Sequence, residues 1–84
     1  MSVFSLHIVS TTEEIFEGNV YSLSIMTSNG RITILPNHTP LVSVVGKGEI
    51  IVKNKEGEEF KFNSEHGVLD VRHSKTVVML HNGD

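Results

Sequence analysis

The sequence contains neither cysteine nor tryptophan, and its 84 residues include only two prolines. The absence of cysteine excludes disulfides, thiolate catalysis and cysteine-bound zinc. Apolar runs are short, far below the roughly 20 residues that a transmembrane helix needs. The N-terminal segment has neither the basic region nor the apolar run of a secretory signal peptide. We therefore expect a protein without disulfides. A bacterial cytoplasmic protein is the simplest interpretation, and a mature organelle chain whose targeting segment has been removed would have the same features.

Basic residues are few and scattered. Seven Lys and Arg stand against ten Asp and Glu, which gives a formal net charge of −3. The chain therefore lacks the electrostatic footprint of a nucleic-acid binder. A chain of 84 residues has room for one domain with one modest core. We expect a single domain over residues 1–84 and no nucleic-acid partner.

Apolar and polar residues alternate with a period of two along most of the chain, which is the spacing of a half-buried strand. Phe4, Leu6 and Ile8 begin this pattern, and no window shows the periodicity of an amphipathic helix. Turn residues divide the chain into about nine to ten short strands, as in β-sandwiches and barrels. The predicted fold class is all-β, a small β-sandwich or flattened barrel.

Four local expectations refine this pattern. Residues 18–19, Gly-Asn, are expected to turn the chain into its next strand. Residues 28–30 end in Asn-Gly, which predicts a hairpin because both residues tolerate a positive φ. Residues 41–45 are apolar on both faces apart from Ser43, so we expect this strand to be covered on both sides. Residues 81–84 are expected to form a polar, disordered tail.

The two prolines, Pro36 and Pro40, bracket a short polar segment that contains Asn37 and His38. Proline fixes φ and lacks an amide donor, so neither proline can lie within a central strand. We expect a strand, a stiff loop that presents Asn37 and His38, and then a second strand. A rigid polar loop on a β scaffold is suited to binding.

No spacing in the sequence predicts catalysis. The five histidines are at least seven residues apart, whereas zinc sites usually include a closely spaced pair of ligands. A nucleophile elbow and a phosphate-binding glycine loop are both missing. Glu56, Glu58 and Glu59 crowd a predicted hairpin tip, which is no place for a glycosidase pair. We expect no catalytic residue, no metal and no cofactor, and we infer a binding module.

Gly30 to Leu41 has the pattern Gly-x-Ile-x-Ile-Leu-Pro-x-His-x-Pro-Leu. It resembles the signature of the ε subunit of F-type ATP synthases, in the N-terminal β-sandwich domain. Three further motifs resemble this family in order, at 6–10, 16–20 and 67–71, and the strand at 77–80 is also similar. The motif positions taken as structural are Gly30, Leu35, Pro36, Pro40 and Gly67.

The resemblance implies a non-catalytic rotor subunit of the central stalk, at the cytoplasmic face of the bacterial inner membrane. Such a subunit docks on the γ subunit and on the c-ring, and it couples proton-driven rotation to ATP synthesis. By the same resemblance, Arg31, Asn37 and His38 face the ring, and Ser10 and Ser43 lie at the γ interface.

The sequence departs from the family in three places. The family often carries an acidic residue where Arg31 stands. His66 replaces the first glycine of a Gly-Gly pair, which leaves Gly67 as the position where a positive φ would require glycine. Family members often continue into a C-terminal helical hairpin, and this sequence stops at Asp84. We therefore expect neither self-inhibition nor nucleotide binding.

Two other functions remain open. The first is a free-standing β-sandwich adaptor for another protein or for a carbohydrate, although a carbohydrate platform needs more aromatic residues than one Tyr and no Trp. The second is a small histidine-metal enzyme, whose ligands would have to converge from distant strand ends.

Overall fold

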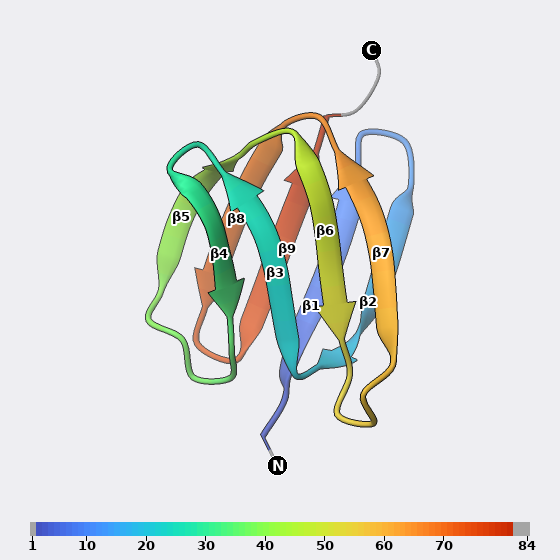
Figure 1. The fold of residues 1–84 in the computed structure, drawn as a ribbon, viewed down its shortest axis with the longest axis vertical. Coiled ribbons are helices and arrows are strands. Elements are labelled where there is room, and N and C mark those ends of the chain that lie inside the picture. The colour runs from blue at the N-terminus through green and yellow to red at the C-terminus, as the bar shows by residue number, and fades with distance from the viewer. Residues whose placement is uncertain (1, 82–84) are drawn as a thin grey trace.

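The computed structural model describes residues 2–81, which form nine strands and no helix within that range (Figure 1). The predicted all-β class is confirmed. The expected tail lies outside the described residues, except for His81. In chain order the strands are β1 (Phe4–Ser10), β2 (Glu14–Val20), β3 (Ser22–Thr27), β4 (Gly30–Ile34), β5 (Leu41–Val45), β6 (Gly48–Lys53), β7 (Glu59–Ser64), β8 (Gly67–Arg72) and β9 (Lys75–Leu80).

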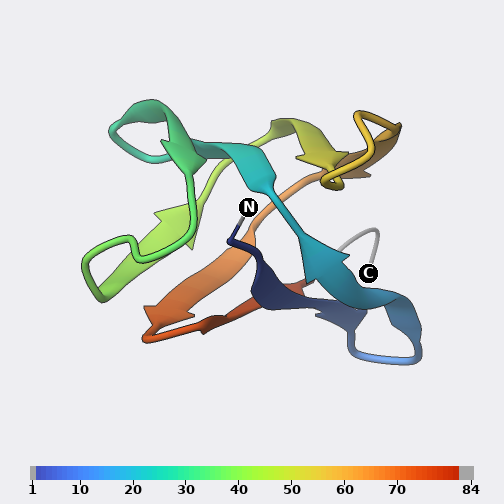
Figure 2. The ribbon, with the colours of Figure 1, turned by 90° about the horizontal axis from the view of Figure 1, so that it is seen from below.

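The strands form two facing layers (Figure 2). The first layer has the order β2-β1-β9-β8-β5, and the second has the order β4-β3-β6-β7. The layers are joined at a corner, where Thr27 of β3 pairs with Val45 of β5. β1 and β9 run parallel, whereas the other paired strands are antiparallel. The molecule is a β-sandwich.

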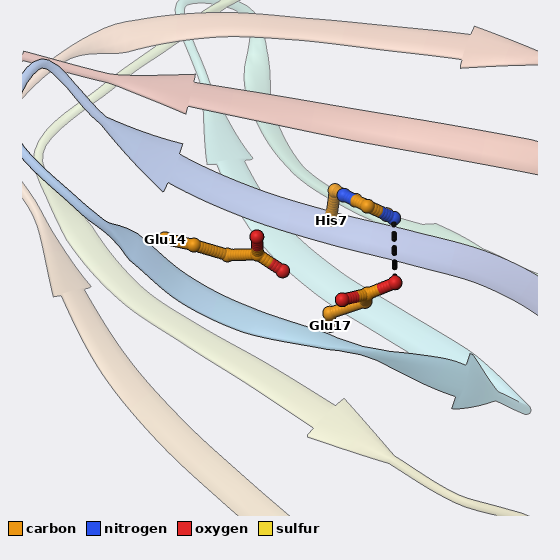
Figure 3. A group of neighbouring side chains, drawn as sticks. All are labelled: His7, Glu14 and Glu17. Carbon is orange, nitrogen blue, oxygen red and sulfur yellow. Dashed lines mark ion pairs between the residues drawn. The ribbon is translucent and has the colours of Figure 1, made fainter.

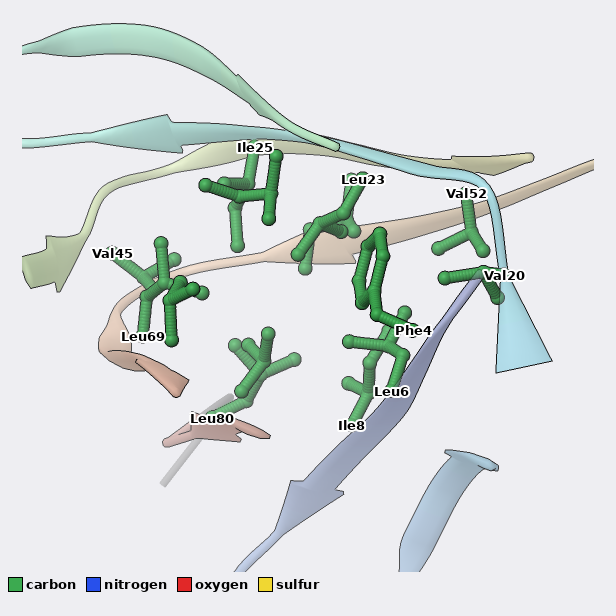
Figure 4. Packing of buried hydrophobic residues seen from close by; sticks show 14 residues of the cluster. Phe4, Leu6, Ile8, Val20, Leu23, Ile25, Val45, Val52, Leu69 and Leu80 are labelled. Atoms are coloured by element: carbon green, nitrogen blue, oxygen red, sulfur yellow. The ribbon is translucent and has the colours of Figure 1, made fainter. Parts of the chain in front are cut away.

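The core fills the space between the two layers (Figure 4). Each strand except β7 contributes at least one buried hydrophobic side chain, and most of these are fully buried. Complete burial of a side chain such as Leu6 or Ile25 stabilises the fold by about 1.5–3 kcal/mol. The buried hydrophobic residues are Phe4, Leu6, Ile8, Val20, Leu23, Ile25, Ile34, Val45, Ile50, Val52, Leu69, Val71, Val78 and Leu80.

Aromatic side chains connect the two layers where their edge strands, β2 and β7, come together. The ring of Phe16 lies 5.7 Å from that of Phe60 and 5.8 Å from that of Phe62, centroid to centroid. Both contacts are tilted or edge-on, which is the favourable geometry for aromatic pairs. This cluster covers the core on the side away from the Thr27–Val45 corner.

The hairpin expected at residues 28–30 is confirmed. Gly30 has a φ of 117° and pairs with Thr27, so Ser28 and Asn29 form a two-residue loop. The hydroxyl of Thr27 donates to the Gly30 carbonyl at 2.7 Å and accepts from the Asn29 amide at 3.1 Å. The buried Thr27 side chain reinforces this turn, in which Gly30 has a positive φ but Asn29 does not, so the Asn-Gly turn expected with both residues at positive φ is not the one that forms.

The turn expected at residues 18–19 is wrong. Gly18 and Asn19 lie inside β2, where they pair with Leu6 and Ser5 of β1. The strand instead continues to Val20, and the chain bends at Tyr21 before β3 begins. Pairing with β1 over the whole length of β2 outweighs the local turn preference of Gly-Asn, as tertiary context often does in sheets.

The expectation that residues 41–45 are covered on both faces is also wrong. Val45 is buried, but Val42 and Val44 are 69% and 57% exposed. Because β5 is a strand of a two-layer sandwich, only its inward face meets the other sheet. Its outward valines are left on the surface.

Gly67 requires a different explanation from the one that the sequence suggested. The described glycines with positive φ are Gly30 and Gly57, so Gly67 does not need glycine for its φ. It pairs with Leu80 of β9, and a Cβ added there would collide with the carbonyl oxygen of Met79 and lie 3.0 Å from the Leu80 Cα. Close approach of two backbones is what requires glycine at this position.

We predict that Gly67→Ala lowers the free energy of unfolding by about 1–3 kcal/mol, because β8 and β9 must move apart to admit the methyl group. Urea denaturation measures the loss. Gly18→Ala is the matched control, since its added Cβ would make ordinary contacts at 3.6 Å or more, and it should change stability far less. Equal effects from the two substitutions would contradict this account of Gly67.

Candidate functional site

The segment between the two prolines is a tight turn. The His38 amide donates to the Leu35 carbonyl at 3.2 Å, and Asn37 has a φ of 66°. Proline at the second position and a positive φ at the third are what a type II turn requires, and Pro36 and Asn37 supply both. The His38 ring folds back on the loop, because its Nδ1 donates to the Thr39 carbonyl at 2.7 Å. Asn37 is exposed, while His38 is half-buried.

Arg31 does not join this loop. It lies at the start of β4, whereas Asn37 and His38 follow the opposite end of that strand. The Arg31 guanidinium donates to Ser24 Oγ at 2.9 Å and to the Glu49 carbonyl at 2.8 Å. The three residues expected on one ring-facing end are therefore divided between two ends of the molecule.

The two serines expected at the γ interface occupy different environments. Ser10 ends β1, and its Oγ accepts from the amides of Thr12 and Glu13, so it stabilises the turn into β2. Ser43 lies opposite Leu69 on the inward side of β5 and is half-buried. The residues that β5 turns outward are the neighbours of Ser43, Val42 and Val44.

An apolar row crosses the outward face of the first layer. Strand register places Val9 beside Met79, Met79 beside Val68, and Val68 beside Val44, which spans β1, β9, β8 and β5. Met79, Val68 and Val44 are 44%, 39% and 57% exposed, and Val9 is half-buried. We call these four residues the apolar row. Because these apolar side chains are contiguous, the row is a candidate docking surface.

The outward face of the second layer is more polar. Register and alternation place Ser24, Thr33, Glu49 and Lys61 there. The two outward faces therefore differ, although both sheets bury apolar residues between them. The first layer therefore presents the more apolar of the two outward faces.

The first layer is also hollowed beside the apolar row. A shallow cleft of about 430 Å³ is lined by Asp70, Arg72, His73, Lys75 and Val77. The Arg72 guanidinium donates to Asp70 at 3.0 and 3.3 Å, and this raises the pKa of Arg72. The cleft adds charged groups next to the apolar row.

One group of possible metal ligands comes together in the described part of the chain: His7, Glu14 and Glu17 (Figure 3). The hydrogen bond between the two carboxyl groups is the main cause that raises the pKa of Glu14 above its usual value, with smaller contributions from desolvation and the charge of Glu17. Among the described residues, His38 and His73 join no such group, and the ring centroids of His66 and His81 lie 5.1 Å apart.

The described part of the chain contains no helix that is long and apolar enough to cross a membrane.

Residues 3–82 match the family model for the β-sandwich domain of the ATP synthase delta/epsilon chain. The chain belongs to this family.

Two relatives of this chain are named ATP synthase epsilon chain, in agreement with the family model. The chain is 35% identical over 78 residues to the ATP synthase epsilon chain of Micrococcus luteus, covering 93% of this chain and 86% of that protein. It is equally identical over 78 residues to the ATP synthase epsilon chain of a Sulfurihydrogenibium species, but spans 58% of that protein's length. It thus matches nearly the whole of one epsilon chain and just over half of another.

Solved structures show the same fold. The chain superposes with a TM-score of 0.89 on a chain of the Euglena gracilis mitochondrial ATP synthase, at 18% identity, covering 95% of this chain and 51% of that one. A chain of the Tetrahymena thermophila mitochondrial ATP synthase central stalk and c-ring gives a TM-score of 0.80 at 10% identity, with coverages of 94% and 63%. These two chains therefore share the fold of this chain at low sequence identity.

Sequence reasoning missed two features of this surface. Val44 of the apolar row was visible as one of the hydrophobic residues on both faces of residues 41–45, but that pattern was interpreted as burial. The proximity of His7 to two glutamates had no sequence signal, since it depends on which residues of β1 and β2 are paired.

Proposed function

We propose that the chain is a non-catalytic rotor subunit in the central stalk of a proton-translocating F-type ATP synthase. Membership of the delta/epsilon family over residues 3–82 supports this function, as does the likeness to proteins named ATP synthase epsilon chain. In this role the domain docks on the γ subunit and on the c-ring, and it transmits rotation of the ring without chemistry of its own. It is then a peripheral protein at the cytoplasmic face of the bacterial inner membrane.

The apolar row is the surface proposed to dock on γ, and the exposure of Met79, Val68 and Val44 supports this placement. Covering exposed apolar area contributes roughly 25 cal/mol per Å² before the costs of association. Met79 and Val68 lie side by side in the middle of the sheet, where a partner can exclude water from both. Ser10 and Ser43 then lie near this contact, with Ser43 facing inward beneath Val42 and Val44.

The ring contact is proposed at the end of the molecule that carries Arg31. Of the three residues expected there, Arg31 alone is a permanent cation, and two hydrogen bonds already orient its guanidinium. A pre-oriented charge loses little side-chain entropy when it meets a polar loop. Asn37 and His38, at the other end of β4, are the second candidate for this contact.

We predict that Val44→Asp weakens binding of purified γ at least about tenfold, because a carboxylate would be buried in an apolar contact. Isothermal titration calorimetry of the full chain with γ measures the change. Thr33→Asp is the matched control, since it places the same group at an exposed β-branched position on the outward face of the second layer.

Normal γ affinity for Val44→Asp, with a loss for Thr33→Asp, would move the docking surface to the other sheet. No binding by the folded wild-type chain would contradict the rotor function itself and favour an adaptor for another protein. Thermal melts establish that each variant is folded.

For the ring contact, we predict that Arg31→Ala lowers ATP-driven proton pumping when the variant is assembled into membranes that lack the wild-type chain. Exposed charge contacts are each worth about 0.2–1 kcal/mol, so loss of the guanidinium should weaken the contact by at most about fivefold and not abolish coupling. His38→Ala, at the other end of β4, should couple normally. The reverse result would assign the ring contact to the loop between the prolines.

A further inference from the structure

A histidine and two glutamates meet on the outward side of the hairpin formed by β1 and β2. His7 comes from β1, and Glu14 and Glu17 come from β2, as Figure 3 shows. One nitrogen or oxygen ligand atom from each residue lies within 4.8 Å of the other two. None of these side chains belongs to the core, and Glu14 lies beside Val9 at the margin of the apolar row.

The pairing of the two strands explains how these residues meet. His7 is directly opposite Glu17, so both side chains leave the sheet on the same face. Glu14 stands three residues before Glu17, and strict alternation would place it on the inward face. The register shifts between Ile8 and Val9, so Glu14 pairs with Val9 and takes the outward side. A β-bulge of this kind re-aims a side chain, and bulges are frequent beside functional sites.

One pair of ligand atoms already has the spacing that a small cation requires. His7 Nε2 lies 3.4 Å from Glu17 Oε2. Two ligands at about 2.0–2.1 Å from a tetrahedral ion are about 3.4 Å apart, so this pair is already at ligand spacing. Glu14 and Glu17 are both exposed, so the third carboxylate can approach without disturbing the core.

We propose that His7, Glu14 and Glu17 bind one divalent transition-metal cation of the zinc class. One imidazole nitrogen with two carboxylate oxygens suits zinc and its neighbours, whereas calcium and magnesium favour oxygen ligands throughout. Three protein ligands leave a fourth position for water.

The bound ion would connect an edge strand to the rest of the sheet. β2 is the last strand of the first layer and pairs only with β1. A ligand from β1 and two from β2 on the same ion would join the strands through side chains as well as backbone. Because β2 also carries Phe16, the ion would help to hold the aromatic cluster that links β2 to β7.

Zinc titration of the full, untagged chain after chelator treatment tests the proposal. We expect one zinc ion per chain by isothermal titration calorimetry, and a rise in Tm of about 4–8 °C at a zinc concentration about five times Kd. Glu17→Gln and His7→Gln should each weaken zinc binding at least about tenfold. Even the loss of a residue that only hydrogen-bonds to a metal ligand lowers metal affinity by roughly 10–100-fold.

Two controls separate this site from other zinc binding. Glu13→Gln removes a carboxylate from the same hairpin outside the cluster and should leave the affinity unchanged. His66→Gln removes one ring of the His66–His81 pair, and it should also have no effect. If His7→Gln does not fold, the exposed Glu14→Gln and Glu17→Gln variants decide the question. The proposal is overturned by the absence of saturable binding, by full affinity in the glutamate variants, or by a loss confined to His66→Gln.

Discussion

The structure depends on the burial of one face of each sheet against the other. Leu6, Ile8, Leu23, Ile25 and Leu69 are fully buried between the layers, and period-two alternation sends their neighbours outward. With a chain this short, little other apolar surface is available to offset the conformational entropy lost on folding. The inward positions are therefore constrained by packing, and the outward positions are free to serve binding.

The outward faces of the two layers carry different kinds of side chain. The second layer presents polar side chains such as Thr33 and Lys61, as expected for a solvated sheet. The first layer presents the apolar row and, at its β2 margin, His7 and two glutamates. A domain that transmits rotation needs a firm contact on one side, and a broad sheet face provides it better than a flexible loop. The same fold occurs in solved structures at 10–18% identity.

Local pattern was enough to predict the all-β class, the Asn-Gly hairpin and the inward residues of β1, because each depends on neighbours along the chain. Non-local pairing was not predictable in the same way. Gly18 stays extended because β1 pairs with it, and Gly67 is needed because β9 passes close by. Val42 and Val44 looked like core because hydrophobicity alone does not distinguish a covered face from an exposed one. Arg31 and His38 are close in sequence, yet β4 separates them.

The central claim is that the outward face of the first layer meets γ. Site-specific photo-crosslinking in the assembled complex tests it most directly, with a photoreactive residue replacing Val44 and, in a second protein, Thr33. The account predicts that position 44 crosslinks to γ while position 33 does not. Crosslinks to γ from position 33 alone would contradict it and would place the docking surface on the polar sheet.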